Sequence, residues 1–83
     1  MWAKLTLAEE RNAYAQQLLI NYLIRDGYTV TYRLILGTTW VKIASEKQLL
    51  MLSIKYNCIA VLEHDHSKIP PVRNWFMENY DVV

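Results

Sequence analysis

Apolar and polar residues alternate along residues 28–44, the period-two pattern of a β-hairpin with one buried face. Gly37 and Thr38 divide this segment, and a glycine at the first central position suits the type II′ turn of a two-residue loop. Such a loop fixes the register of the two strands. On the face away from the apolar one, it pairs two cations and two large apolar residues: Arg33 opposite Lys42, and Ile35 opposite Trp40.

The segment before the hairpin has the periodicity of an amphipathic helix. Thr6 and Glu9 have the spacing of a capping box, which predicts a helix from residue 7 to residue 25 that ends before Gly27. One side of this helix gathers the candidate core residues: Leu7, Ala8, Tyr14, Ala15, Leu18, Leu19 and Tyr22.

The opposite side of the same helix is mixed. Gln16 lies there, and Ile20 and Ile24 form a second apolar strip beside it. A second strip needs a second neighbour. We therefore expect Ile20 and Ile24 to contact either a C-terminal helix or another copy of the chain.

A second helix and a last strand follow the hairpin. Ser45 and Gln48 form another capping box, which predicts a helix over residues 46–56, and Asn57 suits the left-handed conformation at its end. Residues 58–62 are continuously apolar, which predicts a strand that is buried on both faces or central in the sheet. A short helix after Pro71 completes the predicted elements.

These elements follow the order α-β-β-α-β-α and predict an α+β fold. We expect one domain over residues 1–83, with a small, mostly antiparallel three-stranded sheet and the helices packed mainly on one of its faces. The last strand would pair either with the first hairpin strand, in antiparallel, or with the strand that contains Trp40, in parallel.

The composition of the chain limits the classes of function that it can have. Hydrophobic residues make up 53% of only 83, so part of the apolar surface is available for a partner. The formal net charge is +1, so a polyanion would need a local basic patch. Cys58 is the only cysteine, which excludes an intrachain disulfide and favours a reducing compartment. We expect no leader peptide and no membrane contact, and a cytoplasmic location.

The outer face of the hairpin is the strongest candidate for a binding surface. The pair of Trp40 and Ile35 lies there next to the pair of Arg33 and Lys42, which combines an aromatic ring with positive charge. Three interpretations are open. The face contacts another protein, or it binds single-stranded nucleic acid by stacking bases on Trp40, or a helix covers it and Trp40 belongs to the core.

Residues 63–66 hold the candidates for metal chemistry, beginning at Glu63. In an extended segment His64 and His66 point the same way and could both bind zinc. A zinc site needs a third protein ligand, which the spacing does not supply, so we assign neither a metal nor a cofactor. No nucleophile has a base within reach, so the sequence carries no catalytic signature.

The sequence therefore predicts a small, non-enzymatic protein-binding module, inhibitory or accessory, of the size that phages and mobile elements encode. Its partner is another protein or a second copy in a homodimer. The predicted contacts are Arg33, Ile35, Trp40 and Lys42 for the partner, and Ile20 and Ile24 for self-association. The alternative is a single-stranded nucleic-acid-binding protein that uses the same face, and a metal-dependent enzyme at residues 63–66 ranks third.

Overall fold

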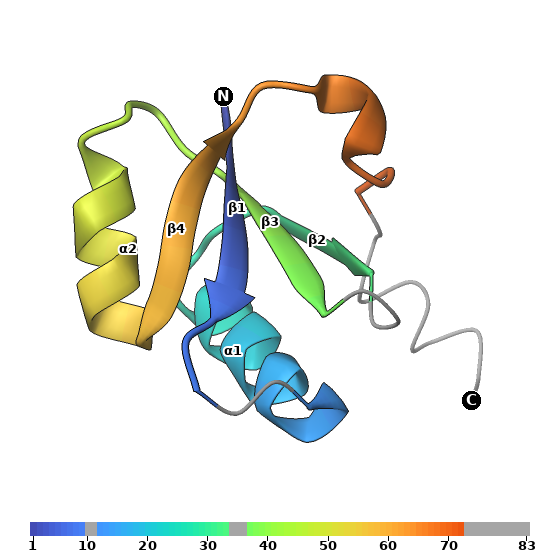
Figure 1. Cartoon of the computed structure of the whole chain (residues 1–83), viewed down its shortest axis with the longest axis vertical. Coiled ribbons are helices and arrows are strands. Elements are labelled where there is room, and N and C mark those ends of the chain that lie inside the picture. Colours follow the sequence, from blue (N-terminus) through green and yellow to red (C-terminus); the bar gives the residue numbers. More distant parts are fainter. Residues whose placement is uncertain (10–11, 34–36, 73–83) are drawn as a thin grey trace.

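The computed structural model describes residues 1–9, 12–33 and 37–72 of the chain. Along these residues the elements are β1 (Trp2–Leu7), α1 (Ala13–Arg25), β2 (Val30–Arg33), β3 (Thr38–Lys42), α2 (Gln48–Tyr56), β4 (Cys58–Glu63) and the short 3₁₀ helix η1 (His66–Lys68). α1 and α2 pack against an antiparallel sheet (Figure 1), which confirms the predicted α+β class. The helix predicted after Pro71 falls on residues outside the described ranges.

The sheet has four strands instead of the three predicted, in the order β2-β3-β1-β4 (Figure 1). Every neighbouring pair is antiparallel. β1 and β2 are therefore parallel with β3 between them, and β3 and β4 are parallel with β1 between them. Each helix links two parallel strands that a third strand separates, so the chain forms two split β-α-β units.

β1 is the strand that the sequence patterns did not predict. Ala3 and Leu5 are buried and alternate with Lys4 and Thr6, as in a strand with one face in the core. The capping box predicted at Thr6 is wrong, because Thr6 pairs with Ile59 inside the sheet. Strands on both sides of β1 provide partners for its backbone groups, and this outweighs a local signal for a helix start.

α1 begins at Ala13 and not at residue 7. Asn12 caps it, since the side-chain Oδ1 of Asn12 accepts a hydrogen bond from the backbone N–H of Ala15 at 2.8 Å. The helix ends at Arg25 as predicted, and Gly27 follows in the left-handed region with a φ of +92°.

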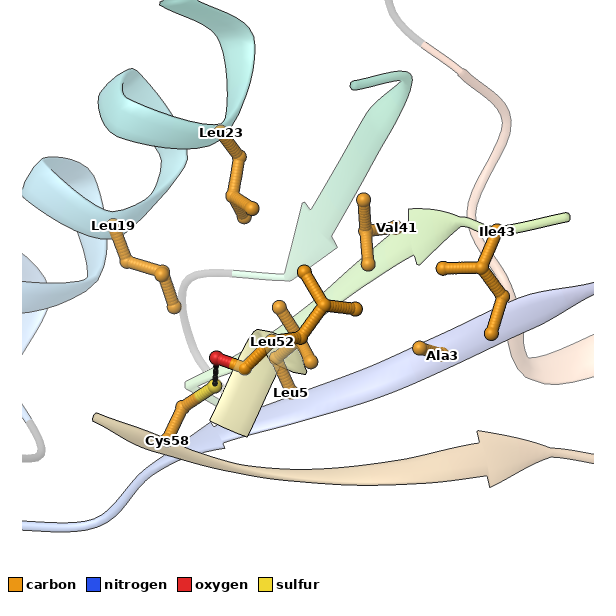
Figure 2. Packing of buried hydrophobic residues seen from close by; sticks show 8 residues of the cluster. All are labelled: Ala3, Leu5, Leu19, Leu23, Val41, Ile43, Leu52 and Cys58. Atoms are coloured by element: carbon orange, nitrogen blue, oxygen red, sulfur yellow. Dashed lines mark hydrogen bonds between the residues drawn. The ribbon is translucent and has the colours of Figure 1, made fainter. Parts of the chain in front are cut away.

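The core lies between the two helices and one face of the sheet (Figure 2). Both helices therefore pack on the same face, as predicted. The buried side of α1 is nevertheless rotated from the predicted one, because Tyr14 is 74% exposed whereas Gln16 and Ile20 are buried. Tyrosine tolerates such exposure because its hydroxyl can bind water. The buried core residues are Ala3, Leu5, Leu19, Leu23, Val41, Ile43, Leu52 and Cys58.

The hairpin keeps its predicted faces but not its predicted register. Among the described residues Val30 pairs with Val41 and Arg33 with Thr38, whereas a turn at Gly37 and Thr38 would place Arg33 opposite Lys42. The shift in register is four residues, and an even shift leaves each described side chain on its predicted face. Arg33 therefore does not lie opposite Lys42.

A buried side chain from α1 contacts both strands of the hairpin, at the last pair that the structure describes. The Nε2 group of Gln16 donates to the carbonyl oxygens of Arg33 and Thr38, at 3.5 and 3.2 Å, and to Oγ1 of Thr39 at 3.3 Å. Arg33 and Thr38 form the last pair of the two strands among the described residues. Gln16, predicted to lie on the side of the helix away from the core, thus ties both strands of the hairpin to α1.

α2 and β4 follow the predicted pattern more closely. α2 begins at Gln48 instead of residue 46, and Gln48 provides its half of the predicted capping box, since its Oε1 accepts from the Ser45 N–H at 3.3 Å. Asn57 has the predicted left-handed conformation, with a φ of 50°. β4 is an edge strand, however, and the prediction of a central or doubly buried strand is wrong. Within the described ranges, neither α1 nor α2 is long and apolar enough to cross a membrane.

Cys58 is buried at the start of β4, where its thiol donates to the carbonyl oxygen of Leu52 at 3.6 Å (Figure 2). Burial raises the pKa of this thiol from 9.0 to about 11, because the thiolate would lose its hydration. We expect iodoacetamide to alkylate Cys58 at pH 8 roughly 100-fold more slowly in the folded protein than in urea, since the thiolate is the reactive form. Mass spectrometry of quenched samples measures both rates, and equal rates would contradict the burial.

Candidate functional site

The second face of the sheet, opposite the helices, is where the sequence predicted a binding surface. Its side chains alternate along each strand with those that enter the core. They include Lys4 and Thr6 of β1, Thr31 and Arg33 of β2, Trp40 and Lys42 of β3, and Ile59, Val61 and Glu63 of β4.

Trp40, the predicted centre of that surface, is only 3% exposed. Its indole Nε1–H donates to Oε1 of Glu63 at 3.3 Å. Trp40 lies on β3 and Glu63 on β4, with β1 between them, so the indole side chain extends across a central strand. Of the three interpretations, the one in which Trp40 is buried is therefore correct. The indole ring is not available to stack on a ligand.

The chain that follows β4 crosses this face; we call residues 64–72 the crossing segment. After Glu63 it passes through η1, and the carbonyl oxygen of Pro71 accepts a hydrogen bond from the hydroxyl of Thr31 at 3.1 Å. Glu63 and Thr31 belong to the two opposite edge strands of the sheet (Figure 1). The crossing segment thus leads from one edge to the other and contributes to the burial of this face.

A pocket of about 340 Å³ lies between the crossing segment and the sheet. Every strand contributes to its lining, and so does η1. The lining residues are Lys4 of β1, Arg33 of β2, Thr38 and Trp40 of β3, Glu63 of β4 and Lys68 of η1.

The pocket carries an excess of positive charge. Lys4, Arg33 and Lys68 are cations and Glu63 is the single acidic lining residue. None of the three cations forms an ion pair among the described residues, where both ion pairs involve Asp26 on the other side of the molecule. Like charges gathered around one space repel, and an anionic ligand would relieve that repulsion.

Glu63 uses only part of its hydrogen-bonding capacity. Its Oε1 accepts from Trp40, while its Oε2 has no hydrogen bond within the described part of the chain. No side-chain oxygen or nitrogen there is both fully buried and unpaired, so the Oε2 atom of Glu63 reaches solvent. Since Glu63 lines the pocket, we infer that this oxygen is an acceptor open to it.

The structure separates the residues that the sequence grouped together. Arg33 and Trp40 meet in the pocket, whereas Lys42 is exposed outside it and Ile35 lies outside the described residues. Of the two residues predicted for self-association, Ile20 is fully buried within one chain and Ile24 is half-buried. Ile20 therefore cannot contact a second copy while this fold is intact.

The candidate metal segment is divided as well. His64 and His66 are exposed, while Glu63 is engaged by Trp40. Asp65 forms a local turn, in which the Ser67 hydroxyl and backbone N–H donate to its Oδ1 and hold the pKa of Asp65 below its usual range. Among the described residues, no three His, Cys, Asp or Glu side chains lie close enough together to bind a metal ion.

A second pocket, of about 370 Å³, lies between α1 and α2 on the helical side. Its two cations, Arg25 and Lys55, are already paired with Asp26 at 3.4 and 3.3 Å. The hydroxyl of Tyr56 also donates to Asp26. That hydrogen bond, with the two cations, lowers the pKa of Asp26, and burial together with the same bond raises the pKa of Tyr56. Because both cations of this pocket are already paired with Asp26, this pocket is the weaker candidate for a ligand-binding site.

Sequence reasoning missed Lys4, Lys68 and the role of Glu63. The alternation of Lys4 and Thr6 with Ala3 and Leu5 was the available signal for β1, and with it for Lys4 on the second face. Lys68 had no such signal, because only the path of the crossing segment brings it to the sheet.

Comparison of the chain with protein-family models, with curated proteins and with solved structures finds no match.

Proposed function

We propose that this protein is a protein-binding module that pairs with a second copy of itself along the free edge of β4. One observation carries the proposal. β4 is an edge strand with no charged residue from Cys58 to Leu62, and two of its apolar side chains, Ile59 and Val61, are 50% and 43% exposed. Natural edge strands of this kind are normally shortened, charged or covered unless they bind another strand.

The backbone of β4 is oriented for such pairing. Met1 and Ile43 exchange hydrogen bonds in both directions, so odd-numbered residues of β1 direct their backbone groups towards β3. Even-numbered residues of β1 then direct theirs towards β4, where their register partners are Ile59, Val61 and Glu63. By the same alternation, the N–H and C=O groups of Ala60 and Leu62 point away from the sheet, towards an incoming strand.

The opposite edge of the sheet is protected. β2 has four residues, ends in the charged Arg33, and is tied to the crossing segment through Thr31 and Pro71. A short, charged and covered edge resists pairing with another strand. The contrast between the two edges favours β4 as the surface for association.

A second copy fits this edge without electrostatic conflict. In an antiparallel two-fold pairing centred on Ala60, Ile59 of one copy lies opposite Val61 of the other, and Cys58 lies opposite Leu62. Only uncharged residues meet along the paired strands. The exposed Ile59 and Val61 of both copies would then form one apolar patch in the middle of an eight-stranded sheet.

A lysine at Ile59 tests this surface. We expect the wild-type protein to have the mass of a dimer in analytical ultracentrifugation at tens of micromolar, and Ile59→Lys to weaken the dimer about tenfold or more, because it brings charge into the apolar patch. The matched control is Ile54→Lys, which makes the same change on the outer side of α2, where Ile54 is 73% exposed. This control should remain dimeric.

Two outcomes would contradict the edge pairing. A wild-type protein that stays monomeric at these concentrations has no such interface. Dissociation by Ile54→Lys but not by Ile59→Lys would place the contact on α2.

Ala60→Pro gives a second test, because it removes an outward N–H at the edge without removing a hydrogen bond to β1, and it should also favour the monomer. A retained unfolding transition shows that each variant is folded.

The alternative function as a single-strand binder has less support. Stacking platforms need exposed aromatic rings, and Trp40 is buried against Glu63. Cations remain on the second face, so weak electrostatic binding of a polyanion would persist and would weaken steeply with salt. The metal-dependent enzyme ranks third, since nothing in the placement of His64 and His66 gathers a ligand set.

A further inference from the structure

We propose that the pocket on the second face binds a small phosphomonoester, whose phosphate is held by Lys4, Arg33 and Lys68. This inference is independent of the association through β4. It rests on the lining of the pocket, on its net charge and on the acceptor that Glu63 presents.

The three cations are positioned by different elements. Lys4 comes from the central strand β1, Arg33 from the edge strand β2 and Lys68 from η1 on the crossing segment. Residues far apart in sequence thus converge on one space, and no carboxylate pairs with any of them within the described residues. Basic side chains placed for solubility alone have no reason to share a pocket.

The charge of the pocket matches a phosphomonoester better than a carboxylate or a phosphodiester. Three cations and the Glu63 carboxylate give a net charge of +2 for the lining residues (3 − 1 = 2). A phosphomonoester carries about −1.5 to −2 at neutral pH, whereas a carboxylate or a phosphodiester carries a single charge. Arg33 adds the planar donor fork that binds two phosphate oxygens at once.

Glu63 indicates what the rest of the ligand carries. Its Oε2 is an acceptor within a cationic pocket, and there it would repel a bare phosphate but accept a hydrogen bond from a hydroxyl or amino group. Thr38 and the buried Trp40 form the remaining wall. The volume of about 340 Å³ is at the small end of the range for organic ligands, which suits a sugar phosphate.

Two-dimensional ¹H–¹⁵N NMR of the full chain tests the site, with ribose 5-phosphate, inorganic phosphate and uncharged ribose as probes. We expect ribose 5-phosphate to cause saturable shifts in the backbone signals of Lys4, Thr38 and Lys68 and in the indole signal of Trp40. Ribose should cause none, and inorganic phosphate should bind more weakly than ribose 5-phosphate.

Variants assign the binding to the pocket. Arg33→Ser and Lys68→Ser each remove one exposed cation from the lining and should weaken ribose 5-phosphate about tenfold or more. Lys42→Ser is the matched control, because Lys42 is an exposed cation on the same face outside the pocket, and it should leave the affinity within about twofold. Glu63→Gln keeps an acceptor for Trp40 and removes the negative charge, so inorganic phosphate should bind more tightly than to the wild type.

Three results would overturn the proposal. The first is the absence of saturable shifts with ribose 5-phosphate up to tens of millimolar. The second is an equal loss of affinity in Lys42→Ser, which would indicate unspecific attraction. The third is tighter binding of a ten-nucleotide thymidine strand than of ribose 5-phosphate at physiological salt, which would assign the face to nucleic acid.

Discussion

Replacing Trp40 with alanine is expected to destabilise the protein by about 3–5 kcal/mol, the range for removing a buried tryptophan side chain. Trp40 is 3% exposed, so the substitution leaves a cavity, and it also deprives the buried Glu63 carboxylate of its hydrogen-bond donor. Domains of this size are stable by only about 5–15 kcal/mol. Urea denaturation should therefore show a large fall in the unfolding midpoint or a protein that is already partly unfolded.

Trp40→Phe separates the two contributions. Phenylalanine keeps most of the buried ring but has no N–H for Glu63, so we expect a smaller loss of about 1–3 kcal/mol. A Trp40→Ala protein as stable as the wild type would show that the indole is not packed as described. A loss of partner binding in Trp40→Ala would by itself say little about an interface, because the substitution first damages the fold.

Replacing Gln16 with leucine is expected to cost about 1–3 kcal/mol, although leucine is the more hydrophobic residue. Gln16 is 2% exposed, and its Nε2 group donates to the carbonyl oxygens of Arg33 and Thr38, one on each strand of the hairpin. Leucine leaves these acceptors and Oγ1 of Thr39 without that donor. The urea midpoint should fall while the m-value stays unchanged, since the folded surface is similar.

The neighbouring glutamine is the matched control. The Nε2 group of Gln17 donates to Oδ1 of Asn21 on the exposed side of α1, at 3.0 Å. We expect Gln17→Leu to change the stability by no more than about 0.5 kcal/mol. If the two leucine variants were equally stable, the hydrogen bonds of Gln16 to the two hairpin strands would have no net effect on the stability.

The error in the hairpin register shows what alternation can and cannot determine. Arg33 was expected opposite Lys42 and pairs instead with Thr38. Alternation has a period of two, so any even shift satisfies it equally well. Gln16 favours the observed register, but it is 17 residues from Arg33 in the sequence, and no pattern within the hairpin reveals that contact.

The misplaced first helix has a related cause. Thr6 and Glu9 match a capping box, and the alternation of residues 2–7 matches a strand equally well. Propensity and local signals are weak beside the pairing of a whole strand. Because β1 pairs with both β3 and β4, its absence from the prediction also left β4 to be paired with one of the hairpin strands instead of with β1.

The sequence likewise predicts only some of the residues of the candidate sites. Arg33 could be selected from its place on the outer face of the hairpin, but Lys4, Glu63 and Lys68 join it only because all four strands and η1 border one pocket. Conversely, Ile20 was expected at a surface and is buried in the fold. Exposure depends on which segments pack together, and that information lies outside any local window.

The sequence by itself determined the α+β class, the end of α2 at Tyr56, the left-handed Asn57 and the face of each hairpin side chain that the structure describes. These features depend on residues within a turn or two of one another, where capping and periodicity act. Only the tertiary structure decided that Trp40 is buried, that β4 is an edge strand and that three cations line one pocket. Those features depend on strand order and on the crossing segment, which arise from contacts between residues distant in the chain.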